Sequence, residues 1–394
     1  MNRKQFLILV AVLVVLGGAG LAIIWQDISA YRASGARIGA KLLPDLKIAE
    51  VAELRLQDAK QQVTLARTEK GWVVQERGGY PASFQEISDF LIKLVELKVT
   101  QSEQVGASLL PRVELAEPGA KEGAGTLIEM KDAAGKPLAR LVIGKKVLKK
   151  DPMNPLPAAK DGVPAGRYVL PPNAKDTVVV VSDPLNSVTA SPGRWLSKDF
   201  FKADRIRTLA VGPEGAAPSW KIARAEEWGQ WKFAAGGGAL NPGAAVGAVN
   251  KLGSLGFDDV AANAKADATD KPVVAVAETF DNLVYRVKAA RKKQGNEYLV
   301  SFTVTGEPPR SRAPEKGEKK EDTERRDKEF AESRKRLAER IAAEKALARW
   351  TYVVEARELE PVLASRSEMT ARKSDGRAPP GFPPGFPPGF PGMR

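Results

Sequence analysis

The chain has 394 residues, contains neither histidine nor cysteine, and carries a formal net charge of +13 at neutral pH. The two missing residue types exclude Ser-His-Asp and Cys-His triads, thiolate nucleophiles, disulfides, and metal sites that need imidazole or sulfur. The length exceeds what one hydrophobic core usually reaches, so we expect two or more domains. The hydrophobic and charged fractions, 43% and 28%, are ordinary for a globular protein.

An uncharged apolar segment, Phe6–Trp25, follows a short amino-terminal peptide. As a helix it would be about 30 Å long, which is the thickness of the hydrocarbon core of a bilayer. Arg3 and Lys4 favour a cytoplasmic location for residues 1–5. The sequence therefore predicts a single-pass anchor in a bacterial inner membrane, with the bulk of the chain in the periplasm. A cleaved signal peptide is the alternative.

A first α+β repeat is expected over residues 48–203, after a juxtamembrane linker at residues 26–47. It begins with three short segments of alternating polarity, VAELRLQ, QQVTLAR and GWVVQER, which predict an antiparallel meander. An amphipathic helix follows, and its start carries the capping-box signature of Ser83 and Glu86. Its apolar residues recur with helical spacing; they are Phe84, Ile87, Phe90, Leu91, Leu94 and Val95. A hairpin around Asp132–Lys136 and the strands GRYVLPP and TVVVVSD complete the repeat.

The same order recurs over residues 204–371. IRTLAVG, SWKIARA and GQWKFAA match the meander, so that Trp231 stands where Trp72 stands. A helix opens at Pro242; its apolar members are Val246, Val249, Leu252, Leu255 and Phe257. LVYRVKAARKKQGNEYLVSFTVTG matches the hairpin, and WTYVVEARELEPVLASRSEM matches the following strand and pairs Tyr352 with Tyr168. The predicted fold class is α+β: a transmembrane helix followed by two tandem homologous repeats, each with a meander, an amphipathic helix and a hairpin.

Trp72 and Trp231 allow two interpretations. Alternating strand positions beside an amphipathic helix are where cores are built, so we expect both rings to pack in cores. The alternative is that they stack on a ligand.

The second repeat contains a charged insertion at residues 314–349, whose equivalent in the first repeat is taken to be the proline-rich loop KKDPMNPLPAAKDGVPAG. Acidic and basic residues at helical spacing predict a helix from about Asp322 onward. Its few large apolar residues are the candidate partner-binding set: Phe330, Leu337, Ile341 and Leu347. Either the helix is a solvent-exposed insertion after which the chain returns to the sheet, or it is a projecting arm that docks a protein partner.

The chain ends in a tail at residues 372–394 that repeats Pro-Pro-Gly-Phe. Proline and glycine at this density cannot pack a core, so we expect a disordered, polyproline-like appendage. Its phenylalanines, Phe382, Phe386 and Phe390, are candidates for binding a receptor of extended peptides.

The anchor, the segment LLPDL, and the stretches VAELRL, VTLARTEKGWVV and SFQEISDFLIKLVELKV together resemble a bacterial family known as a domain of unknown function. The resemblance covers about residues 1 to 370. Members of that family are membrane-anchored and are often encoded beside gliding-motility-type ABC exporter components, which include a permease and an auxiliary extracytoplasmic subunit. The resemblance implies nothing about the charged insertion or the tail, and it carries over no functional residue.

These observations favour a non-enzymatic envelope protein that acts as an accessory or scaffold subunit of an ABC-type export system. A module that binds an anionic envelope polymer or anionic lipid is the alternative, because the chain is strongly basic. No glycine-rich phosphate loop and no identifiable pair of carboxylates supports an enzyme, and we expect no cofactor, no metal and no small-molecule substrate. Nucleic acid is not an expected partner, since no aromatic-interleaved basic stretch is present.

Overall fold

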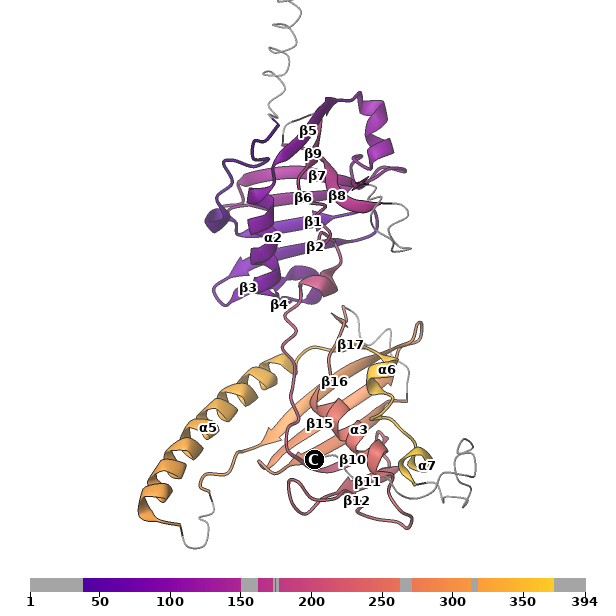
Figure 1. Cartoon of the computed structure of the whole chain (residues 1–394). Coiled ribbons are helices and arrows are strands. Elements are labelled where there is room, and N and C mark those ends of the chain that lie inside the picture. Colours follow the sequence, from indigo (N-terminus) through magenta and orange to yellow (C-terminus); the bar gives the residue numbers. More distant parts are fainter. Residues whose placement is uncertain are drawn as a thin grey trace, which may run out of the picture. The chain divides into compact units, whose positions relative to one another are not determined.

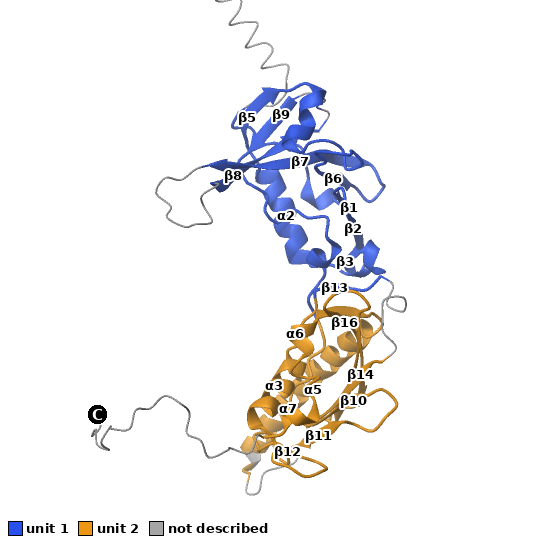
Figure 2. Cartoon of the chain, turned by 90° about the vertical axis from the view of Figure 1, so that its right-hand side faces the viewer, with its two compact units in different colours: residues 1–199, 258–263 blue, residues 200–257, 264–394 orange. Residues whose placement is uncertain are grey.

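The computed structural model describes residues 38–149, 162–172, 174, 177–262, 271–312 and 318–371 (Figure 1). The chain divides into two compact units: unit 1 contains residues 1–199 and 258–263, and unit 2 contains residues 200–257 and 264–394 (Figure 2). The expected anchor and the Pro-Pro-Gly-Phe tail lie outside the described residues. Within the described ranges, none of the helices has the length and apolar character needed to cross a membrane.

Unit 1 is built on a 9-stranded antiparallel sheet with the strand order β4-β3-β2-β1-β6-β7-β8-β9-β5. Its strands are β1 (Glu53–Gln57), β2 (Gln62–Thr68), β3 (Gly71–Val74), β4 (Tyr80–Pro81), β5 (Val99–Gln104), β6 (Thr126–Lys131), β7 (Pro137–Lys149), β8 (Val163–Leu170) and β9 (Thr177–Val181). The 3-10 helices are η1 (Ile48–Glu50), η2 (Gln75–Arg77), η3 (Ala107–Val113) and η5 (Pro192–Trp195). The first three strands form the predicted meander, and β6 and β7 form the predicted hairpin.

Helix α2 (Phe84–Glu96) lies across one face of this sheet (Figure 1). It buries Ile87, Phe90, Leu91 and Leu94, as the helical spacing predicts. Phe84, in the first turn of the helix, is instead 68% exposed, although its spacing from Ile87 and Leu91 places it on the same side. The edge of the Phe90 ring packs against Trp195, with 5.5 Å between ring centroids.

The predicted capping box at the start of α2 is only half formed. The Ser83 hydroxyl accepts a hydrogen bond from the Glu86 amide at 3.3 Å. The reciprocal bond is replaced, since the Ser83 amide donates to the Trp195 carbonyl and the Glu86 carboxylate pairs with Arg194 at 2.7 Å. A tertiary contact has therefore displaced one half of the local motif.

Unit 2 has its own antiparallel sheet, in which its strands follow the order β12-β11-β10-β14-β15-β16-β17. These strands are β10 (Ile206–Pro213), β11 (Trp220–Ala223), β12 (Lys232–Phe233), β14 (Val273–Thr279), β15 (Leu283–Arg291), β16 (Glu297–Gly306) and β17 (Tyr352–Glu355). Its helices are α3 (Pro242–Gly253), α5 (Lys320–Leu347), α6 (Ala356–Leu359) and α7 (Arg366–Met369). The short strand β13 (Asp259–Val260) lies in residues 258–263, which belong to unit 1. The structure is thus of the α+β class with two antiparallel sheets and few helices.

The core of unit 2 contains a cluster of aromatic rings. Phe200 lies 4.5 Å from Tyr352, 4.6 Å from Phe201, 5.2 Å from Phe257 and 5.4 Å from Phe302, measured between ring centroids. These rings meet at tilted or edge-on angles, which their quadrupoles favour over face-to-face stacking. The linker Phe200–Phe201 is therefore part of the core of unit 2.

The strand-by-strand matching expected from the sequence differs by one strand from the positions of the strands in the two sheets. β14, which received no sequence prediction, pairs with both β10 and β15, as β6 pairs with both β1 and β7. By position in the two sheets, β14–β15 stands where the β6–β7 hairpin stands, and β16 stands where β8 stands. Tyr352 on β17 accordingly matches a position on β9 and does not match Tyr168. The charged insertion lies between β16 and β17, so its equivalent is the β8–β9 connection and not the proline-rich loop that follows β7.

Helix α3 begins at Pro242 as predicted, and the Asn241 side chain caps it by accepting from the Gly243 and Ala244 amides. Its buried face consists of Ala245, Ala248 and Leu252, whereas Val246 is 46% exposed. Leu255 and Phe257 are buried beyond the end of the helix. The buried face of α3 thus consists mainly of small alanine side chains, whereas valines were expected there from the sequence.

Candidate functional site

The predicted charged helix exists as α5, which extends away from the strands of unit 2 (Figure 1). Among its described side chains, only Ile341 and Glu344 are buried. Of the predicted partner-binding residues, Ile341 is 5% exposed and packs within unit 2, so it is not available to a partner. Phe330, Leu337 and Leu347 are partly exposed. The helix is thus attached by its carboxyl-terminal turns and presents the rest of its length.

Glu344 connects the carboxyl-terminal turns of α5 to the rest of unit 2 by hydrogen bonds. Its two carboxylate oxygens accept hydrogen bonds from the Lys202 amide at 3.0 Å and from the Tyr285 hydroxyl at 2.9 Å. The Arg340 guanidinium lies 3.6 Å from the same carboxylate and pairs with Asp204 at 2.7 Å. Burial raises the pKa of Glu344 above its ordinary value, and burial together with the Glu344 charge raises the pKa of Tyr285.

A second group of contacts stabilises the amino-terminal and middle turns of α5. Arg312, which precedes the helix, bonds to Asp327 at 2.6 Å, to Glu318 at 2.8 Å and to the Thr323 carbonyl at 3.2 Å. Arg334 donates to the Arg310 carbonyl at 2.8 Å. These bonds hold the outer turns in helical form without burying them. Phe330 and Leu337 therefore stay partly exposed on an ordered helix.

A basic ribbon extends from the sheet of unit 1. Strand β7 continues beyond the β8–β9 pairing through Lys145, Lys146 and Lys149, all of them exposed. The apolar side chains of Leu148 and Val163 at the same end are 47% and 43% exposed. Cationic and apolar side chains gathered on one projecting ribbon can contact an anionic surface.

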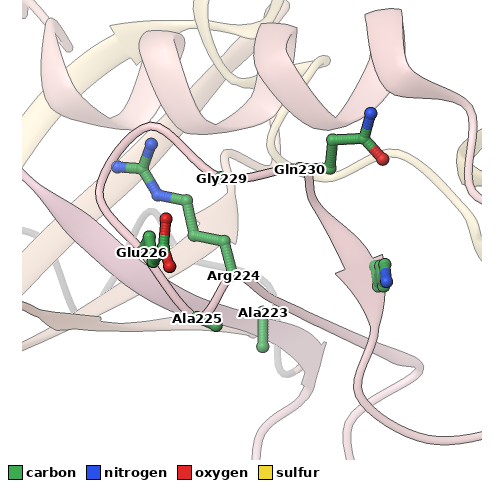
Figure 3. Close-up of a pocket in the computed structure, with 7 residues that line it drawn as sticks. Ala223, Arg224, Ala225, Glu226, Gly229 and Gln230 are labelled. Atoms are coloured by element: carbon green, nitrogen blue, oxygen red, sulfur yellow. The ribbon is translucent and has the colours of Figure 1, made fainter.

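A shallow open pocket lies in the loop between β11 and β12. Its lining is formed by Ala223, Arg224, Ala225, Glu226, Gly229, Gln230 and Lys232. Figure 3 shows Arg224, Glu226 and Gln230 distributed around the loop that surrounds this pocket. The Arg224 guanidinium lies over the Trp231 ring, 4.8 Å from its centroid, and Trp228 on the same loop is 91% exposed.

The two matched tryptophans have different environments. Trp72 is buried, with 9% of its surface exposed, as predicted, whereas Trp231 is partly exposed, so the prediction of a core ring is wrong for Trp231. Strand β12 is only two residues long and begins after Trp231, so the sheet does not enclose this ring. The most deeply buried tryptophans are Trp195 and Trp220, whose indole N–H groups donate to the Thr189 and Ala364 carbonyls.

The sequence did not lead us to predict that Glu344 attaches α5 to the rest of unit 2. The available signal was its spacing, since Glu344 stands three residues after Ile341 and shares its helix face. An acidic residue at an otherwise apolar position indicates a buried carboxylate with specific partners. Trp228 was also missed, because an exposed aromatic side chain in a loop has no periodic signal.

Within the ranges that the structure describes, no three acidic side chains lie close enough together to hold a metal ion. Comparison with protein-family models, with curated proteins and with solved structures finds no match for this chain. The candidate site with the most developed geometry is α5, a long helix that is attached at its carboxyl-terminal end, held by further hydrogen bonds in its amino-terminal and middle turns and largely exposed.

Proposed function

We propose that the protein is a non-enzymatic, membrane-anchored scaffold or accessory subunit of an ABC-type export system, with α5 as the arm that contacts a protein component of that system. The observation that carries this proposal is the attachment of α5. Its 28 residues would span about 42 Å, yet only its last turns are buried. A helix that is ordered by dedicated contacts and left exposed is suited to present one face to another protein.

The face that α5 offers a partner combines a small apolar centre with charged surroundings. Phe330 and Leu337 are its partly exposed large apolar residues outside the attached turns, and they stand two turns apart. A docking interface needs such anchors within a polar rim. Leu347 is near the attached end and contributes less, and Ile341 belongs to the attachment.

The choice of partner rests on the family resemblance and on the expected anchor. A single span at residues 6–25 with the bulk of the chain in the periplasm would keep both units beside an inner-membrane permease. The partner would then be the permease or its auxiliary extracytoplasmic subunit. No step of this role requires a cofactor or catalysis by the chain itself.

We further infer that the two units arose by duplication of one α+β unit. The strands of unit 2 follow the order β12-β11-β10-β14-β15-β16-β17, which parallels β3-β2-β1-β6-β7-β8-β9 in unit 1. Val74 on β3 pairs with Leu65 on β2, and Phe233 on β12 pairs in the same way with Ile222 on β11. Trp72 and Trp231 each stand two residues before these paired residues. Experimental structures of the two units that superpose strand for strand would support this origin; a different path for β16 and β8 would contradict it.

The function is tested by crosslinking the full-length protein in its native membrane, followed by purification and mass spectrometry at low and high salt. Retention of an ABC permease or its auxiliary subunit at high salt is the expected result. The double variant F330A/L337A should lose that component, because it removes both apolar anchors. The matched control A331S/A338S changes two exposed positions on the same helix and should retain it. Equal recovery from both variants would show that α5 is not the docking arm.

The basic ribbon of β7 favours a second candidate function, binding of an anionic envelope polymer or anionic lipid. Binding of this kind weakens as salt screens the charges. The variant K145E/K146E/K149E should then lose retention of the full-length protein on an immobilised anionic polysaccharide. The control K60E/K70E/K121E makes the same change of charge at exposed lysines elsewhere in unit 1. Equal loss in both variants would indicate a general effect of net charge and would exclude a site on the ribbon.

A further inference from the structure

Three exposed or partly exposed aromatic residues lie on the edge strand β12 of unit 2 and in the loop that precedes it. They are Trp228, which is 91% exposed, and Trp231 and Phe233, which are partly exposed; we call these three residues the β12 aromatic surface. β12 is the last strand in its sheet, so no further strand covers this side. A tryptophan left almost entirely in water is uncommon, because burying an aromatic side chain is strongly favourable.

The arginines beside the β12 aromatic surface are engaged by groups of unit 2 itself. Arg205 binds the Glu227 carboxylate with two hydrogen bonds, at 2.9 and 2.8 Å, and also pairs with Asp281. Arg224 lies over the Trp231 ring, and Arg366 lies over Phe233, 4.4 Å from the ring centroid. The surface is therefore better suited to an uncharged ligand that stacks on rings than to a charged ligand.

The described chain leads toward this surface at its carboxyl-terminal end. The Asn241 amide donates to the Met369 carbonyl at 2.9 Å, and the Ala371 amide donates to the Ala239 carbonyl at 2.8 Å. This pattern is antiparallel, so the described chain runs back, up to Ala371, along the segment that follows β12. The Arg366 side chain fixes this arrangement by donating to the Gly237 carbonyl at 3.2 Å.

We propose that the Pro-Pro-Gly-Phe segment of the same chain, Pro379–Pro391, binds the β12 aromatic surface as a polyproline-type ligand. Proline rings stack on indole rings, and an indole N–H can donate to the free carbonyls of a polyproline helix. The segment contains only Pro, Gly and Phe, so it offers no charge that would have to be desolvated. The recurring phenylalanines provide equivalent anchors for the exposed Trp228 ring.

The length of the tail allows this contact within one molecule. Trp228 and Ala239 are separated by 11 residues, which can span at most about 40 Å, and Ala239 is bonded to Ala371. The residues after Ala371 would extend for about 70 Å as a polyproline helix. A short tether gives an effective concentration in the millimolar range, so a weak dissociation constant of about 1 mM is sufficient for substantial occupancy.

The test uses the full-length protein purified in detergent, with a photo-crosslinking phenylalanine analogue at position 386. Irradiation followed by mass spectrometry should give crosslinks within one chain to the loop of residues 224–233. Trp228→Ala should reduce that crosslink at least fivefold and leave the melting temperature unchanged, because the side chain is exposed. Phe84→Ala is the matched control, since Phe84 is 68% exposed in unit 1, and it should leave the crosslink intact.

A second readout does not depend on crosslinking chemistry. In full-length protein labelled with 5-fluorotryptophan, the resonance of Trp228 is assigned by its loss in Trp228→Phe, and it should shift when Phe382, Phe386 and Phe390 are all replaced by serine. Crosslinks scattered over both units, or an unshifted Trp228 resonance, would overturn the proposal. Crosslinks confined to covalent dimers would assign the surface to the tail of a second copy and would equally overturn binding within one chain.

Discussion

At the scale of single residues, the most informative side chain is Glu344. It is 2% exposed, which is unusual for a carboxylate, and it stabilises the attachment of α5 through the Lys202 amide and the Tyr285 hydroxyl. A buried carboxylate is tolerated only when hydrogen bonds replace its lost hydration. Because the loss of hydration on burial outweighs these bonds, the pKa of Glu344 is raised.

The raised pKa predicts how Glu344 affects stability. The native state binds the proton more tightly than the unfolded chain, so the contribution of Glu344 is most favourable at low pH. It declines as the pH rises from the ordinary value of 4.5 to the raised native pKa, and it is constant above that pKa. Glu344→Gln should therefore gain stability relative to the natural protein across this interval, as measured by chemical denaturation at several pH values. Glu339→Gln on the exposed face should follow the natural protein, and parallel curves for all three would contradict the assignment.

Trp220 gives a second prediction at this scale. Its ring is 1% exposed, and its indole N–H donates to the Ala364 carbonyl at 2.7 Å. Trp220→Phe leaves a cavity and an unsatisfied carbonyl, and it should lower the free energy of unfolding by about 2 kcal/mol. Trp228→Phe changes an exposed ring and should alter it by less than about 0.5 kcal/mol. Denaturant titrations of both variants measure the difference, and similar losses would show that Trp220 is not a core anchor.

At the scale of elements, α2 and α3 show how the same role is filled by different sequences. α2 buries large side chains such as Phe90 and Leu94, whereas α3 buries Ala245 and Ala248 beside Leu252. The glycines of α3 lower its intrinsic helix propensity. Its stability therefore depends on the Asn241 cap and on the burial of Ala245, Ala248 and Leu252.

Gly247 in α3 offers a stabilising substitution. A Cβ added there would meet no heavy atom within 4 Å, so Gly247→Ala should raise the free energy of unfolding by about 0.5 to 1 kcal/mol through helix propensity. Gly253→Ala is the matched comparison, because its Cβ would lie 3.2 Å from the Ala203 carbonyl and the crowding offsets the gain. Thermal melts of the two variants give the test. A loss of stability in Gly247→Ala would mean that α3 is not a regular helix in solution.

At the scale of the whole molecule, the chain passes between the units more than once. Residues 258–263 belong to unit 1, although the chain on either side belongs to unit 2. Arg77 holds this segment in unit 1 with two hydrogen bonds to Asp259, at 2.8 and 2.7 Å. Lys198 adds a bond to the Asp258 carbonyl at 3.0 Å, and burial lowers the pKa of this lysine.

Removal of the ion pair between Arg77 and Asp259 should destabilise the segment of residues 258–262. Both side chains are partly buried, so Arg77→Ala should cost about 1 to 3 kcal/mol and should speed amide exchange in residues 258–262. Exchange in β15 of unit 2 should be unchanged. The control is Arg112→Ala, which removes an exposed arginine from unit 1. Unchanged exchange at residues 258–262 in Arg77→Ala would show that the segment is held by other contacts.

Much of the fold follows from local patterns. The meander β1 to β3, the hairpin β6–β7, the helix α2 and the starts of α3 and α5 were predicted from periodicity and from capping and turn residues, which act over a few neighbouring positions. The strand β14 and its pairing with β10 and β15 were missed, because strand pairing joins residues far apart in the sequence. The charged helix α5 was predicted from the sequence, but its attachment to the rest of unit 2 through Glu344 was not predicted.

The sequence by itself determined the class of local elements, the absence of histidine and cysteine chemistry, and the positions of the amphipathic and charged helices, since composition and short-range spacing decide these features. Only the tertiary structure decided which faces are covered. It buries Ile341 within unit 2, and it places Trp220, but not Trp231, in the core. It also pairs the Glu86 carboxylate with Arg194 instead of with the helix cap. The physical reason is that burial and ion pairing depend on contacts between distant segments, which no local pattern specifies.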